Sequence, residues 1–126
     1  MKFIQIFLLP ILFILLGQSL QAQTPVAQNE RLPKVMTDTL EVNGVCKMCK
    51  ARIEEAAMYE RGVKFAEWTA DSQQLVVIYK TKRTSSQQIC EAIAKAGHNT
   101  ELVQASDEAY EKLPGCCKYR DGVEVH

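Results

Sequence analysis

The order of strand-like and helix-like segments is the feature that most limits how this chain can fold. Six segments follow one another, at residues 35–42 (strand), 49–59 (helix), 63–70 (strand), 75–79 (strand), 85–96 (helix) and 99–103 (strand). This order is typical of the split βαβ arrangement. We therefore predict an α+β fold, a ferredoxin-like βαββαβ sandwich with a four-stranded antiparallel sheet and two helices on one face.

The spacing of apolar residues indicates which side of each segment is buried. Leu75, Val77 and Tyr79 lie two residues apart in a β-rich run and are expected to share one face of a strand. Ile89 and Ile93 lie one helical turn apart, which predicts that they point inward. In the first strand the inner set is Met36, Asp38, Leu40 and Val42, and the carboxylate of Asp38 interrupts it.

Residues 1–22 have the layout of a signal peptide. Lys2 precedes an apolar run that contains Pro10 and is shorter than the roughly 20 residues of a membrane-spanning helix. We expect cleavage after Ala22, although Leu20 is larger than the usual residue there, which leaves an uncleaved anchor as the alternative. The layout predicts a periplasmic or secreted protein that has no membrane contact after cleavage.

Residues 23–34 are polar, contain Pro25 and Pro33 and show no periodicity, so we interpret them as a flexible leader. Removing residues 1–22 takes away one basic residue, Lys2, so 14 Lys and Arg remain against 15 Asp and Glu. This balance gives no electrostatic reason to expect nucleic acid as a partner, because nucleic-acid binding requires clustered positive charge.

Cys46 and Cys49 form a Cys-x-x-Cys motif where a loop turns into the first predicted helix. Two intervening residues let both sulfurs reach one ion, and the helix amides with Lys47 and Lys50 favour thiolates. Copper(I) accepts two thiolates, whereas zinc usually takes four ligands, so copper(I) is the expected ion, with zinc or mercury(II) as alternatives. The motif alone also suits a redox protein, half of a zinc site or a structural disulfide.

The wider pattern resembles the heavy-metal-associated domain family, which includes copper chaperones, amino-terminal modules of copper-transporting ATPases and periplasmic mercury-binding proteins. The resemblance covers residues 35–103, within a predicted domain at residues 35–104, and rests on four motifs: Cys46 to Cys49, Gly62-Val63, Leu75-Val76-Val77 and Ala96-Gly97-His98. It implies that Cys46 and Cys49 are the metal ligands and that the protein is not an enzyme. The family commonly has Gly-Met-Thr before the first cysteine, whereas this chain has Asn43-Gly44-Val45.

Two further residues near the motif have open roles. The resemblance places His98 beside the metal loop, where it could be a third ligand, could hydrogen-bond a cysteine sulfur, or could be a solvated turn residue. Met48 lies inside the motif, and we expect it to pack beneath the loop, with its thioether as a soft ligand in the alternative. Cys90 lies in the second helix and is expected to be a buried, inert thiol.

Residues 105–126 form a C-terminal tail with a vicinal pair, Cys116 and Cys117. The tail and the His98-x-Thr-Glu turn are similar to those of small exported metal-binding proteins of Bacteroidetes type. Tyr110 and Leu113 have helical spacing, so a short helix is expected to dock on the domain and bring one cysteine to the metal site. The alternative is a vicinal disulfide or exposed thiols.

These features predict an exported soft-metal carrier or scavenger, with a metal-transporting ATPase or another metal-binding protein as its partner. One alternative is a thiol-disulfide oxidoreductase, which a Cys-x-x-Cys motif at a helix start also suits. Thioredoxin-like enzymes place a cis-proline opposite the motif, yet this chain has no proline between Pro33 and Pro114. A second alternative is a metal-sensing module that regulates an efflux system by protein contact.

Overall fold

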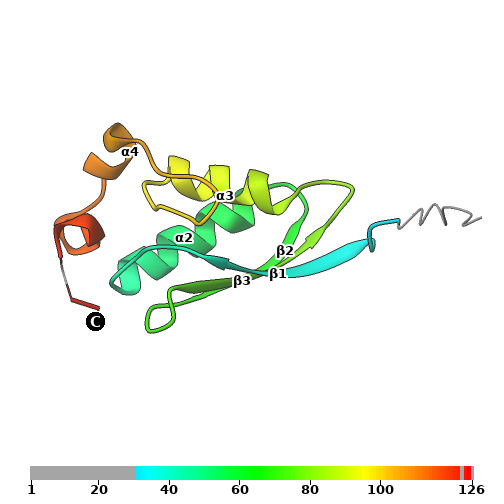
Figure 1. Ribbon diagram of the computed structural model, residues 1–126, viewed down its shortest axis with the longest axis horizontal. Coiled ribbons are helices and arrows are strands. Elements are labelled where there is room, and N and C mark those ends of the chain that lie inside the picture. Colours follow the sequence, from blue (N-terminus) through cyan, green and yellow to red (C-terminus); the bar gives the residue numbers. More distant parts are fainter. Residues whose placement is uncertain (1–30, 123, 126) are drawn as a thin grey trace, which may run out of the picture. The chain divides into compact units, whose positions relative to one another are not determined.

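The computed structural model describes residues 31–122 and 124–125 (Figure 1). The predicted signal peptide, residues 1–22, and residues 23–30 of the predicted leader lie outside the described residues. No helix in the described part of the chain is long and apolar enough to cross a membrane.

Three antiparallel strands form the sheet, in the order β1-β3-β2. They are β1 (Val35–Glu41), β2 (Val63–Thr69) and β3 (Gln74–Lys80). The central strand β3 pairs along its whole length with β1, from Val35 opposite Lys80 to Glu41 opposite Gln74. Two longer helices, α2 (Lys47–Tyr59) and α3 (Ser86–Lys95), lie on the same side of the sheet (Figure 1). The α+β class and the antiparallel sheet are thus confirmed.

The prediction of a fourth strand at residues 99–103 is wrong for the described residues. Only Thr100 pairs with the sheet, through an isolated bridge to Val42. The Thr100 hydroxyl accepts from the backbone N–H of Val103 at 2.9 Å, and the Thr100 N–H donates to the Val103 carbonyl at 2.8 Å. These local bonds satisfy groups that a longer ladder would use, so the chain reverses after one bridge.

The core lies between the sheet and the two helices. Leu75, Val77 and Tyr79 are buried on one face of β3, as predicted, and Ile89 and Ile93 of α3 are fully buried. Asp38 is tolerated on the inner side of β1 because its carboxylate accepts hydrogen bonds from the hydroxyls of Tyr79, at 2.7 Å, and Ser86.

The tail folds into a short helix, α4 (Asp107–Glu111), and two 3-10 turns, η1 (Gly115–Cys117) and η2 (Tyr119–Asp121). Ser106 caps α4 by accepting from the Ala109 N–H at 3.1 Å. Tyr110 and Leu113 are both buried, which confirms that the tail docks through them. Figure 1 shows the tail at the end of the domain where α2 begins.

Candidate metal centre

The loop between β1 and α2 presents Cys46 and Cys49 together. Cys46 is the N-cap residue of α2, with an extended backbone at φ −148°, and Cys49 follows in the first turn. Residues three apart in a helix lie on one face, so the two sulfurs approach to 3.5 Å. Both side chains are buried beneath the protein surface, which removes most water from the pair.

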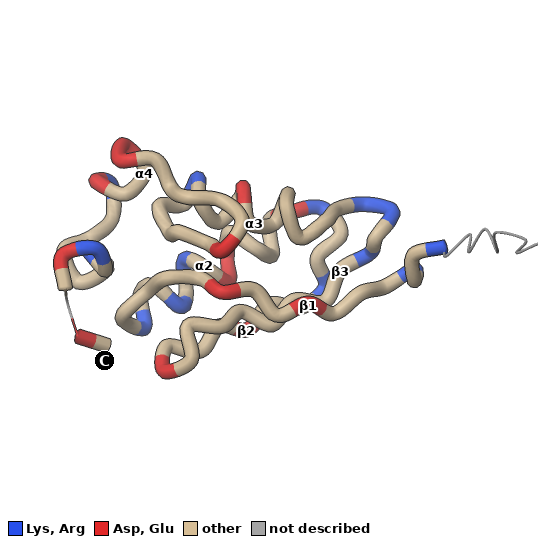
Figure 2. The backbone as a smooth tube through the Cα atoms, viewed as in Figure 1, with Lys and Arg blue, Asp and Glu red and all other residues tan. Residues whose placement is uncertain are grey.

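The start of α2 favours a thiolate on Cys46. The first turn carries no acidic residue and basic positions follow along the helix (Figure 2). Burial raises the pKa of Cys46, but hydrogen bonds from the Cys49 amide, the thiols of Cys49 and Cys117 and the Met48 amide outweigh burial and lower the pKa to about 7. The pKa of Cys49 is raised, chiefly because burial disfavours its charged form. Cys46 is therefore the thiol that ionises first of the two.

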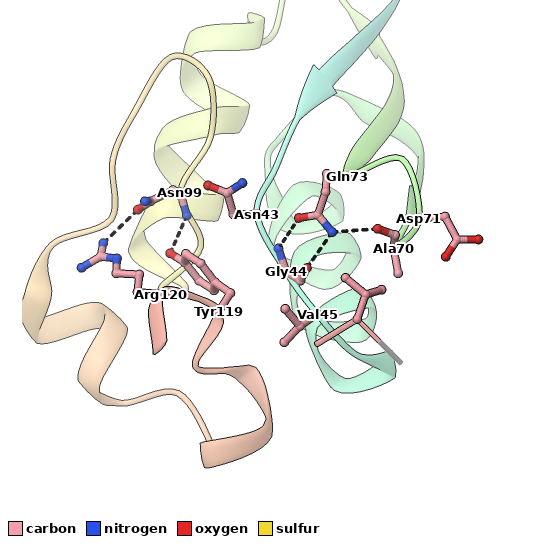
Figure 3. A pocket seen from close by; sticks show the side chains of 10 residues that line it. Asn43, Gly44, Val45, Ala70, Asp71, Gln73, Asn99, Tyr119 and Arg120 are labelled. Atoms are coloured by element: carbon pink, nitrogen blue, oxygen red, sulfur yellow. Dashed lines mark hydrogen bonds between the residues drawn. The ribbon is translucent and has the colours of Figure 1, made fainter. Parts of the chain in front are cut away.

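Trp68 and Gln73 both stabilise the metal loop, Trp68 by packing against it and Gln73 by hydrogen bonds to its backbone. A Cβ atom on Gly44 would lie 3.0 Å from the Trp68 ring, so the indole packs directly against the loop that lacks the family's methionine. The Trp68 indole N–H donates to the Val42 carbonyl at 3.0 Å. Gln73 accepts from the Gly44 N–H at 2.9 Å and donates to the Gly44 carbonyl at 2.7 Å (Figure 3).

Cys117 brings a third thiol to the loop. Its sulfur lies 3.7 Å from that of Cys46, although 71 residues separate them in the sequence. The prediction that the tail folds back to the Cys-x-x-Cys motif is therefore confirmed. Burial, followed by the neighbouring thiols of Cys49 and Cys46, raises the pKa of Cys117. The ligand atoms of Cys46, Cys116 and Cys117 all lie within 4.8 Å of one another, an arrangement that could hold a metal ion.

Hydrogen bonds to the end of α3 fix the tail in this position. The Tyr119 hydroxyl donates to the Gly97 carbonyl at 2.9 Å and accepts from the Asn99 N–H at 2.8 Å (Figure 3). Arg120 donates to the Asn99 side chain at 2.9 Å and to the Ala105 carbonyl at 2.7 Å. Because Gly97 and Asn99 lie just after α3, the position of Cys117 depends on the same turn that ends α3.

Met48 and Cys116 lie outside the buried thiols. Met48 is 49% exposed, so the prediction that it packs beneath the loop is wrong. The Cys116 thiol donates to the Met48 thioether, with 3.4 Å between the sulfurs, and lies 4.0 Å from the Cys117 sulfur. All five cysteines are free thiols in the structure. Cys90 is buried on α3, as predicted.

His98 is fully buried, so its interpretation as a solvated turn residue is wrong. Its Nδ1 lies 2.8 Å from the Asn43 carbonyl, which can only accept, so Nδ1 carries the proton. Burial lowers the pKa of His98 and keeps the ring neutral. The ring stacks on Tyr119, with 5.6 Å between centroids, and is not part of the described thiol group within 4.8 Å. His98 thus connects the metal loop to the docked tail.

The sequence did not identify Gln73, Tyr119 or Arg120 as parts of the site. Gln73 adopts φ +56°, which is uncommon for a residue other than glycine, and nothing in a polar turn sequence indicates this. The spacing of Tyr119 and Arg120 directly after Cys116 and Cys117 was a usable signal, because a docked cysteine pair needs neighbouring anchors.

No protein-family model matches the sequence, and no curated protein matches it either. Several solved structures do match. A structure described as CopZ metallochaperone is 27% identical, with a TM-score of 0.50, over 52% of this chain and 98% of that chain. Oxidised MerP from Ralstonia metallidurans CH34 is 31% identical, with a TM-score of 0.51, over 56% of this chain and 99% of that chain.

A copper-binding domain from HMA7, a P-type ATPase, is 25% identical, with a TM-score of 0.51, over 53% of this chain and 92% of that chain. Each match spans nearly the whole of the solved structure and about half of this chain, which leaves room for the tail beyond the shared domain. Structural likeness over whole domains, together with the cysteine cluster at the start of α2, identifies the relationship. The chain belongs to the heavy-metal-associated domain family.

Proposed function

We propose that the protein binds one soft metal ion, copper(I), through the thiolates of Cys46, Cys49 and Cys117. The observation that carries this proposal is the convergence of three buried sulfurs, with Cys46 3.5 Å from Cys49 and 3.7 Å from Cys117. Thiolates select soft ions, and copper(I) is satisfied by fewer ligands than zinc. Mercury(II) shares the preference for thiolates, and zinc would need Cys116 as a fourth ligand.

We further propose that the protein works as an exported scavenger that retains its ion. An open pair of thiolates can pass an ion directly to a partner, but here Cys117 covers the pair from a docked tail. Release therefore requires the tail to move away. The recipient would be a metal-transporting ATPase domain or another metal-binding protein that offers competing thiolates.

An anaerobic titration with copper(I) in competition with a coloured chelator tests the buried site. The reduced protein should bind the first ion tightly, and Cys46→Ser and Cys49→Ser should each lose that affinity. Cys117→Ser should bind more weakly than wild type and release the ion faster to the chelator. Cys90→Ala is the matched control, because Cys90 is an equally buried thiol that faces the core from α3. Unchanged affinity in both Cys46→Ser and Cys49→Ser would refute the proposal.

The main alternative is a thiol-disulfide oxidoreductase, since a thiol with a pKa of about 7 beside a second thiol also suits disulfide exchange. Insulin reduction separates the two functions. We expect little activity, because the third thiol and the tail cover the Cys46 sulfur. Turnover comparable with that of a thioredoxin would favour the enzyme. Export is tested by fractionating cells that express the full chain with a carboxyl-terminal tag.

A further inference from the structure

The sulfur atoms around the metal loop form a continuous path from the core to the surface. Consecutive sulfurs along it are 3.5 Å apart from Cys49 to Cys46, 3.7 Å from Cys46 to Cys117, 4.0 Å from Cys117 to Cys116 and 3.4 Å from Cys116 to Met48. Cys49, Cys46 and Cys117 are buried, Cys116 is partly buried and Met48 is half-exposed. One ion bound at the buried end uses only the first three sulfurs.

We propose that Met48 and Cys116 form a second soft-metal position, which shares the thiolate of Cys117 with the buried one. This inference rests on the proposed function, because Cys117 is a ligand of the first ion. Each ion would then have three sulfurs, and Cys117 would bridge them. The ligand class is a monovalent d10 ion, copper(I) or silver(I), since a thioether binds soft ions and is a poor ligand for zinc.

The distances suit this arrangement. A thiolate sulfur lies about 2.3 Å from a bound d10 ion such as zinc, so sulfurs at the corners of a triangle around one ion are about 4 Å apart. The pairs Cys117–Cys116 and Cys116–Met48, at 4.0 Å and 3.4 Å, are close to this separation before any ion binds. Two of the three sides of the second triangle therefore already have about the length that a bound ion requires.

The placement of Met48 is not explained by packing. Its side chain is not among the residues of the hydrophobic core or those packed against it. Met58 lies in the same helix with a similar exposure, 47% against 49% for Met48, yet the described structure gives it no sulfur partner. The contact that distinguishes Met48 from Met58 is therefore the one with the Cys116 sulfur, at 3.4 Å.

Native mass spectrometry of the purified, fully reduced chain with silver(I) tests the proposal, because silver(I) is soft and does not change oxidation state. Wild-type protein should bind two ions. Met48→Leu and Cys116→Ser should keep the first ion and weaken the second about tenfold or more. Met58→Leu is the matched control and should still bind two. Binding of one ion by wild type, or of two with unchanged affinity by Met48→Leu, overturns the inference.

Methionine-methyl NMR gives a second, independent readout. The Met48 methyl resonance should move with the second equivalent of silver(I), while the Met58 methyl resonance stays in place. A Met48 resonance that ignores both equivalents also overturns the inference. These outcomes leave the proposed function intact, since that function fails only if the first ion is insensitive to Cys46→Ser and Cys49→Ser.

Discussion

Replacing Gly97 with alanine should separate the tail from the domain without touching a sulfur. Gly97 has φ +102°, and a Cβ atom there would lie 2.8 Å from the Ala109 carbonyl oxygen and 2.9 Å from Leu113 Cγ. The backbone conformation alone costs alanine about 1–3 kcal/mol. Moving α4 away relieves the clash but exposes Leu113, whose burial is worth about 1.5–3 kcal/mol.

Both routes are unfavourable, so Gly97→Ala should weaken tail docking by about 1–3 kcal/mol, which corresponds to about 5- to 150-fold in the docked population. Hydrogen exchange of the Asn99 amide reports docking, because this N–H donates to the Tyr119 hydroxyl of the tail at 2.8 Å. Transfer of copper(I) to a chelator should accelerate in parallel, since Cys117 then leaves the site more often.

Two glycines of the tail serve as controls that separate backbone strain from the steric clash. Gly122 has φ +75°, and a Cβ atom there would meet no atom within 4 Å, so Gly122→Ala carries strain without a clash. Gly115→Ala carries neither, because Gly115 has an ordinary φ and open space around it. If Gly97→Ala leaves amide protection and copper release at wild-type values, the contact between Gly97 and α4 is not what holds Cys117 in place.

Three more predictions concern the loop. In the metal-free protein, alkylation of Cys46 should reach half its maximal rate near pH 7, because the thiolate reacts and the pKa is lowered to about 7, and a midpoint near 9 would contradict this. Trp68→Phe should lower the free energy of unfolding by about 1–3 kcal/mol in a denaturant titration followed by circular dichroism, because it leaves the buried Val42 carbonyl without its donor; an unchanged midpoint would refute it. Gln73→Ala should speed exchange of the Gly44 amide about tenfold, since two hydrogen bonds of about 0.5–1.5 kcal/mol each are lost, whereas equal protection would show that the loop needs no clamp.

Most of the fold followed from periodicity. The two-residue period of a strand placed Leu75, Val77 and Tyr79 on one face of β3, and helical spacing identified Ile89 and Ile93, because both depend on local geometry. The fourth strand could not be predicted correctly in this way. The Thr100 hydroxyl bonds to its own neighbour Val103, and no alternation of apolar residues reports a side chain that competes with the ladder.

In the site, too, contacts set by local geometry or by chain length were predictable, and contacts that depend on tertiary packing were not. Cys46 and Cys49 are three residues apart, so their approach follows from helix geometry alone. The contact of Cys117 with Cys46 was predictable because the tail is long enough to return to the metal loop. The contact of Met48 with Cys116 was not, because it depends on the side-chain conformation of a methionine that packing does not constrain. Burial of His98 likewise depends on the docking of Tyr119, 21 residues later in the chain.

Because residues 99–103 form a single bridge in place of a fourth strand, one edge of the sheet is left largely unpaired in the described part of the chain. The order β1-β3-β2 places β1 at that edge, and the Thr100 segment reaches only its end: Thr100 bridges to Val42, and Glu101 bonds to the N–H and the carbonyl of Glu41. Before Glu41, the outward-facing main-chain N–H and C=O groups of β1 are not covered by that segment, which makes this part of the strand a template for a strand of another chain. Asp38, a charged side chain that points inward, and Glu41 at the strand end oppose such pairing. The reversal at Thr100 thus directs the chain into the tail that carries Cys117 to Cys46. It also leaves most of the β1 edge without a backbone partner among the described residues, so side-chain charge is what opposes pairing of this edge with another copy of the chain.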